Sequence, residues 1–150
     1  MVRGIAARLA AIFVVTACTQ IVGPARTFRD YELKASSTAS SALSAVRTAQ
    51  LTMKLGREDD AFAPYLSVTA SEAERDAANA SGTFDGIQPP DARAGALGDR
   101  LRGLLAPANA AVREVRIRAR RTELGTRDLQ LERRLARSAR ALDRFESAHS

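Results

Sequence analysis

Apolar residues spaced three and four positions apart restrict the fold of this chain more than any other feature. Between residues 27 and 55 they are mostly small: Ala35, Ala39, Ala42, Leu43, Val46, Ala49 and Met53. This spacing places them on one face of an α-helix, and the alternation typical of a strand is absent. The 150 residues include 30 Ala and 21 Arg, both strong helix formers. The sequence therefore predicts an all-α fold.

Three further segments carry the same spacing, at residues 60–79, 91–122 and 126–148. Their predicted inner residues are Phe62, Leu66, Thr69, Ala73 and Ala77, then Leu97, Leu101, Leu104, Ala108, Ala111, Val115, Arg118 and Ala119, and finally Leu124, Leu131, Leu135, Leu142 and Phe145. Four amphipathic helices joined by three connections bury their apolar faces most simply as an antiparallel up-down four-helix bundle. The many inner alanines predict closely approaching helices around a thin core.

Capping residues and helix breakers predict where these helices begin and end. Thr27 and Asp30 resemble a capping box at the first helix, and Gly56 is expected to end it. Pro107 lies inside the third helix, where it removes a backbone hydrogen bond and predicts a kink or short break. Gly125 is expected to end that helix and Thr126 to cap the fourth. Residues 81–90 predict a non-helical connection, with Phe84 and Ile87 packed against the end of the bundle.

The N-terminal segment has the pattern of an export signal. Arg3 and Arg8 precede an apolar run from Leu9 to Val15, which is shorter than the roughly 20 residues of a membrane-spanning helix. Such a run fits the apolar region of a secretory signal peptide. The alternative is an uncleaved signal anchor, with Cys18 as a buried thiol in a membrane helix.

The tetrapeptide Val15-Thr16-Ala17-Cys18 resembles the lipobox of bacterial lipoproteins. The resemblance implies diacylation of the Cys18 thiol and cleavage just before it by signal peptidase II. Two acyl chains are sufficient for stable anchoring. The expected organisation is a signal peptide at residues 1–17, a tether at 18–26 and a helical bundle at 27–150, attached to the extracytoplasmic face of the cell membrane.

Positive charge is concentrated in the last part of the chain. Residues 18–90 hold 7 basic and 9 acidic side chains, whereas residues 91–150 hold 14 and 8. Arg133, Arg137, Arg140 and Arg144 recur at helical spacing and form the arginine stripe of the last helix. A second cluster consists of Arg113, Arg116, Arg118, Arg120 and Arg121.

The arginine stripe has a functional and a purely structural interpretation. It predicts an anionic partner: lipid headgroups, a cell-wall polymer or an acidic protein surface of the envelope. The structural interpretation is a solvated face neutralised by nearby acids, namely Asp128, Glu132, Asp143 and Glu146. Nucleic acid is not expected, because the domain is predicted to be exported and no aromatic residues interleave with the arginines.

The sequence offers little for catalysis or metal binding. His149 is the only imidazole and lies next to the last residue, and the only thiol is Cys18. No serine lies in a G-x-S-x-G turn and no glycine-rich phosphate loop is present. The acidic residues Glu58, Asp59, Asp60, Glu72, Glu74 and Asp76 lack the spacing of a calcium loop. We therefore expect no enzyme, no metal and no cofactor.

A second resemblance covers roughly residues 31–91. The segments Tyr31–Ala35, Ser41–Ala49, Pro64–Val68, Ser71–Glu74 and Phe84–Asp91 are similar to a family of small actinobacterial lipoproteins. The resemblance implies a helical, envelope-attached protein and brings no catalytic residues. The sequence thus predicts a non-enzymatic interaction or structural module. The alternative is a sensor or ligand-binding bundle. Its ligand is either a small molecule held between the helices, with room near Pro107, or an anionic polymer of the membrane or wall.

Overall fold

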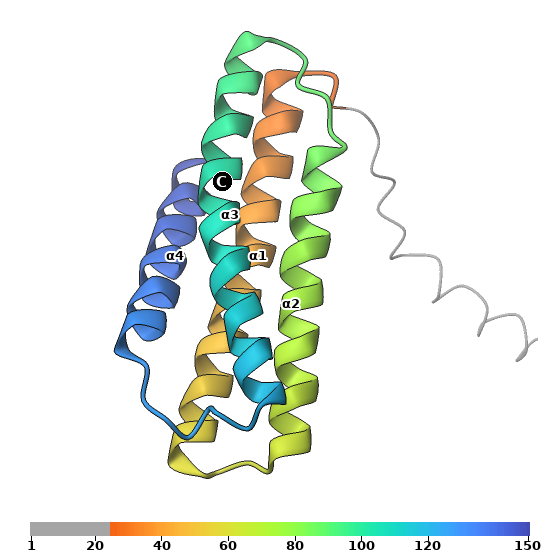
Figure 1. The fold of residues 1–150 in the computed structure, drawn as a ribbon. Helices are drawn as coiled ribbons and strands as arrows, with labels where there is room; N and C mark the ends of the chain where they lie inside the picture. Colours follow the sequence, from red (N-terminus) through yellow and green to blue (C-terminus); the bar gives the residue numbers. More distant parts are fainter. Residues whose placement is uncertain (1–24) are drawn as a thin grey trace, which may run out of the picture.

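The computed structural model describes residues 25–150, which form four α-helices (Figure 1). The helices are α1 (Phe28–Glu58), α2 (Ala63–Asp85), α3 (Ala92–Arg120) and α4 (Leu129–Ala148). No β-strand occurs within these residues. The all-α prediction is confirmed for the part of the chain that the structure describes.

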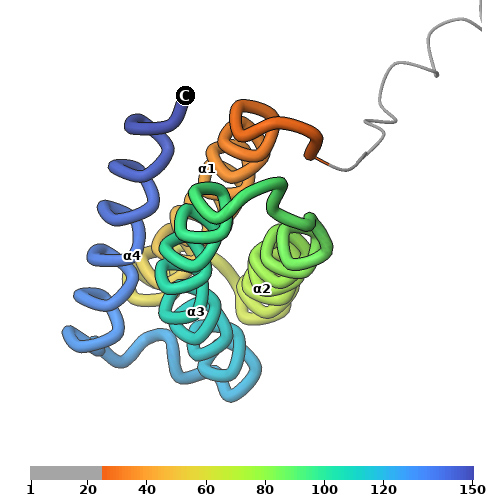
Figure 2. Tube along the Cα trace, turned by 90° about the horizontal axis from the view of Figure 1, so that it is seen from above, coloured from red at the N-terminus to blue at the C-terminus, as the bar shows by residue number. Residues whose placement is uncertain are grey.

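The helices lie side by side, with α1 and α3 in the middle. Each of these two contacts every other helix, whereas α2 and α4 do not contact each other within residues 25–150. The view along the bundle shows α2 and α4 on opposite sides of the α1–α3 pair (Figure 2). Each outer helix therefore has a broad face left to solvent.

Small residues on α1 allow its central position. All seven residues predicted for its inner face are buried, and four of them are alanines: Ala35, Ala39, Ala42 and Ala49. Larger side chains from the other helices fill the space opposite, including Leu101, Leu131, Leu135, Leu142, Phe145 and Phe84, each less than 2% exposed. This division lets helix backbones approach closely while the core is still filled.

The predicted end of the first helix at Gly56 is wrong, because α1 continues to Glu58. Asp59 follows in the left-handed conformation with φ of 57°. The role of Gly56 is spatial: a Cβ there would lie 2.6 Å from Cβ of Leu124. The glycine thus admits the connection between α3 and α4 against the end of α1. The predicted capping box of Thr27 and Asp30 is confirmed.

The limits predicted for the second helix are also wrong. It begins at Ala63 and runs to Asp85, through residues expected to be non-helical. Phe84 explains the extension, since its ring is fully buried with its centroid 5.4 Å from that of Tyr31. The burial of the Phe84 ring stabilises the helix by more than Gly82 destabilises it. Phe84 and Ile87 are buried as predicted, whereas Phe62 precedes the helix and is 73% exposed.

The third helix runs through Pro107 without the predicted break and ends at Arg120. Pro107 is exposed, so water can hydrate the carbonyl that loses its amide partner. The fourth helix begins at Leu129, three residues later than predicted. Asp128 caps it by accepting hydrogen bonds from the amides of Gln130 and Leu131, and this corrects the expectation that Thr126 is the cap.

Candidate anion-binding surface

The apolar and basic residues of α4 lie on opposite sides of the helix. Leu131, Leu135, Ser138, Leu142 and Phe145 are buried. The four members of the arginine stripe, Arg133, Arg137, Arg140 and Arg144, are all exposed. The predicted separation of the two faces is therefore present.

Three of the four acidic residues expected to neutralise the arginine stripe, Asp128, Glu132 and Asp143, pair with arginines of other helices, whereas the Glu146 carboxylate forms no ion pair with a described residue. Asp128 Oδ2 lies 2.6 Å from a guanidinium nitrogen of Arg118 on α3. On the α1 side, Glu132 lies 2.6 Å from Arg57 and Asp143 lies 3.0 Å from Arg47. These acids bind cations of α1 and α3 and do not neutralise the stripe.

The arginine stripe consequently has no ion pair of its own. Within residues 25–150, none of its four guanidinium groups lies within 4.0 Å of a carboxylate. Arg134, also exposed and without an ion pair to a described residue, adds a fifth charge to α4. This face of α4 therefore presents positive charge to the solvent.

The second arginine cluster is mostly neutralised. Arg113 and Arg116 both pair with Glu74 of α2, and Arg118 pairs with Glu114 and Asp128. The structure thus distinguishes two clusters that look alike in the sequence. The arginine stripe is available to a partner, whereas the second arginine cluster joins α2, α3 and the start of α4.

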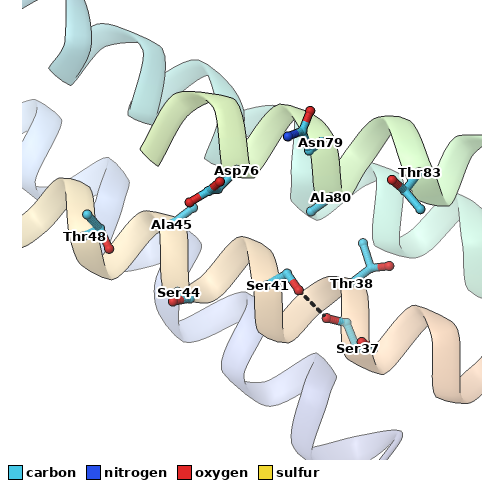
Figure 3. A pocket seen from close by; sticks show the side chains of 10 residues that line it. All are labelled: Ser37, Thr38, Ser41, Ser44, Ala45, Thr48, Asp76, Asn79, Ala80 and Thr83. Carbon is cyan, nitrogen blue, oxygen red and sulfur yellow. Dashed lines mark hydrogen bonds between the residues drawn. The ribbon is translucent and has the colours of Figure 1, made fainter. Parts of the chain in front are cut away.

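Another groove, with a volume of about 500 Å³, lies between α1 and α2. Figure 3 shows its lining of Ser37, Thr38, Ser41, Ser44, Ala45, Thr48, Asp76, Asn79, Ala80 and Thr83. Two of the hydroxyls donate within α1: Thr38 to the carbonyl of Lys34 at 2.9 Å and Ser41 to that of Ser37 at 3.0 Å.

This groove lacks a catalytic combination of residues. Asp76 is the one ionisable residue in its lining, and no histidine or cysteine accompanies it. General acid–base catalysis needs a second titratable group, and a nucleophilic hydroxyl needs a base within hydrogen-bond reach. The sensor alternative expected its ligand near Pro107, which does not line this groove.

The acidic residues considered for a metal do not come together. Within residues 25–150, no group of three or more His, Cys, Asp or Glu side chains is arranged to hold a metal ion. Glu74 is engaged by two arginines. Asp59 instead occupies the position after α1.

His149 is held against the bundle although it is next to the last residue. Its Nδ1 lies 3.0 Å from Oε1 of Glu32, and its ring centroid lies 4.6 Å from that of Phe145. The contacts with His149 and Arg29 lower the pKa of Glu32 below its usual value. Glu32 is ionised at neutral pH and holds His149 against the start of α1.

The predicted lipidation site lies outside the described residues. Cys18 and the lipobox precede Ala25, the first described residue, which is buried against the core. Among residues 25–150, none of the helices combines the length and apolar character needed to cross a membrane.

Comparisons with protein-family models, with curated proteins and with solved structures gave no match to this chain. The candidate surface therefore rests on its geometry and charge.

Sequence reasoning missed one arginine beside the stripe and another that lies near α4. Arg134 lies next to the stripe on α4, and the guanidinium carbon of Arg100, on α3, lies 5.9 Å from the centroid of the Phe145 ring on α4. Arg134 is detectable, since it precedes Arg137 and Ala141 by three and seven residues. Arg100 is not, because its proximity to α4 depends on how the two helices pack.

Proposed function

We propose that this protein is a lipid-anchored, non-enzymatic module of the cell envelope whose arginine stripe binds anionic groups at the extracytoplasmic face of the membrane. One observation carries the proposal: Asp128, Glu132 and Asp143 pair with arginines of α3 and α1. The stripe is thus left unneutralised on an exposed face. An exposed group of arginines without counter-charges attracts anionic lipid headgroups, at about 1 kcal/mol for each cation near the surface.

An antiparallel up-down order of the helices is part of this proposal. Contacts between α1 and α4 support it, because Arg47 pairs with Asp143 and Arg57 with Glu132. The numbers rise in one helix as they fall in the other. The same reversal relates α2 and α3, where Asp85 meets Arg102 and Glu74 meets Arg113.

The anchor proposed at Cys18 is compatible with a bundle lying on its side. Because Ala25 is buried against the core, the free tether is residues 18–24, which reach at most about 25 Å when extended. The 31 residues of α1 make a helix of about 46 Å, which is longer than the reach of the tether. The stripe follows the length of α4, so a sideways orientation lets its four arginines reach the membrane together.

Binding to vesicles tests the proposed function. Residues 19–150 include the entire buried core, whose members run from Ala25 to Phe145. This fragment should bind vesicles containing phosphatidylglycerol and not vesicles of phosphatidylcholine alone. Binding should weaken as salt rises from about 0.1 to 1 M, since the Debye length falls from about 10 to 3 Å. Equal and negligible binding to both vesicles would refute the proposal.

A matched pair of variants separates the stripe from net charge. Replacing Arg133, Arg137, Arg140 and Arg144 by Gln should reduce binding by up to about a thousandfold, since four arginines at about 1 kcal/mol each contribute about 4 kcal/mol. The control replaces four other exposed arginines by Gln: Arg75, Arg120, Arg121 and Arg127. Both variants lose the same charge, so an equal loss of binding would show that only net charge matters.

A further inference from the structure

A groove of about 330 Å³ lies between α3 and α4, beside the arginine stripe. Its lining consists of Leu104 and Pro107 from α3 and Arg134, Arg137, Ser138 and Ala141 from α4. The small side chain of Ala141 leaves space beside Leu104, and both residues are half-buried. The groove thus combines three apolar residues, Leu104, Pro107 and Ala141, which we call its apolar floor, with two exposed arginines.

The charges around this groove favour an anion. Neither Arg134 nor Arg137 forms an ion pair with another residue of the described chain. On α3, Glu114 pairs with Arg118 and Asp99 with Arg102. These two acids of α3 are therefore engaged elsewhere, and Asp128, which interacts electrostatically with Arg134, also pairs with Arg118. A phosphate can accept hydrogen bonds from two guanidinium groups.

The apolar floor restricts the kind of anion. A free phosphate or a wall polymer would leave Leu104, Pro107 and Ala141 in contact with water. An amphiphile with its anionic group next to a hydrocarbon chain fills both parts of the groove. Each methylene buried in this way is removed from water, which favours binding.

We propose that this groove binds one anionic phospholipid of the membrane. Its phosphate lies between Arg134 and Arg137, and one acyl chain lies against Leu104, Pro107 and Ala141. This inference rests on the proposed function, because both need the exposed side of α4 to face the membrane. It adds a defined lipid site to a surface that otherwise binds headgroups through charge alone.

Photolabelling of the full lipid-anchored chain tests this site. The protein is reconstituted in phosphatidylcholine vesicles that contain a trace of phosphatidylglycerol with a photoreactive group at the end of one acyl chain. After irradiation, label should concentrate within residues 103–113, 138–140 and 141–144, the three tryptic peptides that carry the groove. A phosphatidylcholine probe with the same chain should label them about five-fold less, a difference of roughly 1 kcal/mol.

Variants distinguish the groove from the surface around it. Ala141→Leu fills the groove and should lower labelling of these peptides about five-fold or more. Ala106→Leu, at an exposed position of α3 outside the groove, should keep it. Combining Arg134→Gln with Arg137→Gln removes no apolar floor and should abolish the preference for the phosphatidylglycerol probe.

The outcomes separate this inference from the proposed function. In the vesicle-binding experiment, Ala141→Leu should bind as the unaltered fragment does, because it keeps every arginine. Labelling spread evenly along the chain, or unchanged by Ala141→Leu, would overturn the lipid site while leaving the arginine stripe standing. Label displaced by an acidic, leucine-containing peptide but not by excess phosphatidylglycerol would identify a peptide groove instead. No preference for anionic vesicles in the unaltered protein would overturn both.

Discussion

Tyr31 and Gly98 illustrate how single residues define the packing of this core. Tyr31 is fully buried near the start of α1. Its hydroxyl lies directly against the backbone of Gly98 on α3, in the space that a Cβ would occupy. Residue 98 must therefore lack a side chain, although its backbone has an ordinary helical conformation.

Gly98→Ala should destabilise the protein by about 1–3 kcal/mol, the usual cost of overpacking a core. Gly103, on the same helix, faces open space. Gly103→Ala should instead stabilise the protein by about 0.5–1 kcal/mol, because alanine is the better helix former. Urea unfolding of the two variants measures this difference. Equal effects would show that Tyr31 moves aside without cost.

Glu32 joins the beginning of α1 to the end of the chain through His149 and also pairs with Arg29 at 3.1 Å. Contacts with His149 and Arg29 lower the pKa of Glu32 from its ordinary value of 4.5. A lowered pKa in the folded state means that folding favours the ionised form. This contribution to stability is present above pH 4.5 and is lost as the pH falls through the lowered value.

Glu32→Gln should therefore lower the free energy of unfolding at pH 7 and change it little at strongly acidic pH. Urea unfolding of both proteins between neutral and acidic pH measures this difference. A difference that does not vary with pH would show that the carboxylate charge contributes nothing. His149→Ala removes the largest cause of the shift and should raise the pKa of Glu32, which nuclear magnetic resonance can follow.

The residues at which the helices begin and end were the hardest feature of the helices to predict from the sequence. Thr126 and Asp128 are both residue types that cap helices, and they lie two positions apart. Only Asp128 caps α4, and hydrogen bonds from the amides of Leu131 and Gln130, with nearby Arg118, lower its pKa. Arg118 on α3 lies 2.6 Å from Asp128 and favours a carboxylate at that position. We therefore attribute the cap at Asp128, rather than at Thr126, to Arg118.

Asp128→Ala should cost about 0.5–2 kcal/mol, the usual range for loss of an N-cap. The matched substitution Thr126→Ala should change stability by less than about 0.5 kcal/mol, as surface changes usually do. Thermal unfolding followed by circular dichroism measures both. A larger loss at Thr126 would show that the cap lies there.

At the scale of the whole molecule, the arrangement of helices determines which charges remain available. Arg47 and Arg57 of the central helix α1 engage Asp143 and Glu132 of α4. The same arrangement places α4 at the side of the bundle, away from α2. The arginine stripe therefore faces solvent because of where α4 packs.

The proposed anchor is tested on the whole protein in the cell. Cys18→Ser should abolish incorporation of radiolabelled fatty acid and leave the precursor uncleaved, because serine lacks the thiol that is acylated. Thr19→Ala, just outside the lipobox, should incorporate the label normally. Lipidation of the Cys18→Ser protein would contradict the anchor.

Much of the fold was predictable because it depends on local pattern. Apolar spacing placed the inner residues of α1 and α4 correctly, since a helix exposes a side chain according to its position in the turn. Phe62 was misplaced, because its spacing fits the inner face but the helix begins after it. Phe84 extended α2 through a burial that depends on Tyr31, far away in the sequence.

The sequence by itself determined four amphipathic helices and an arginine stripe on the outer side of the last one. These properties follow from helical periodicity, which is local. Only the tertiary structure decided that Asp128, Glu132 and Asp143 bind arginines of α3 and α1 and that a groove opens beside Ala141. Ion pairs form between side chains that are close in space, and which helices become neighbours is decided by how their apolar faces pack together.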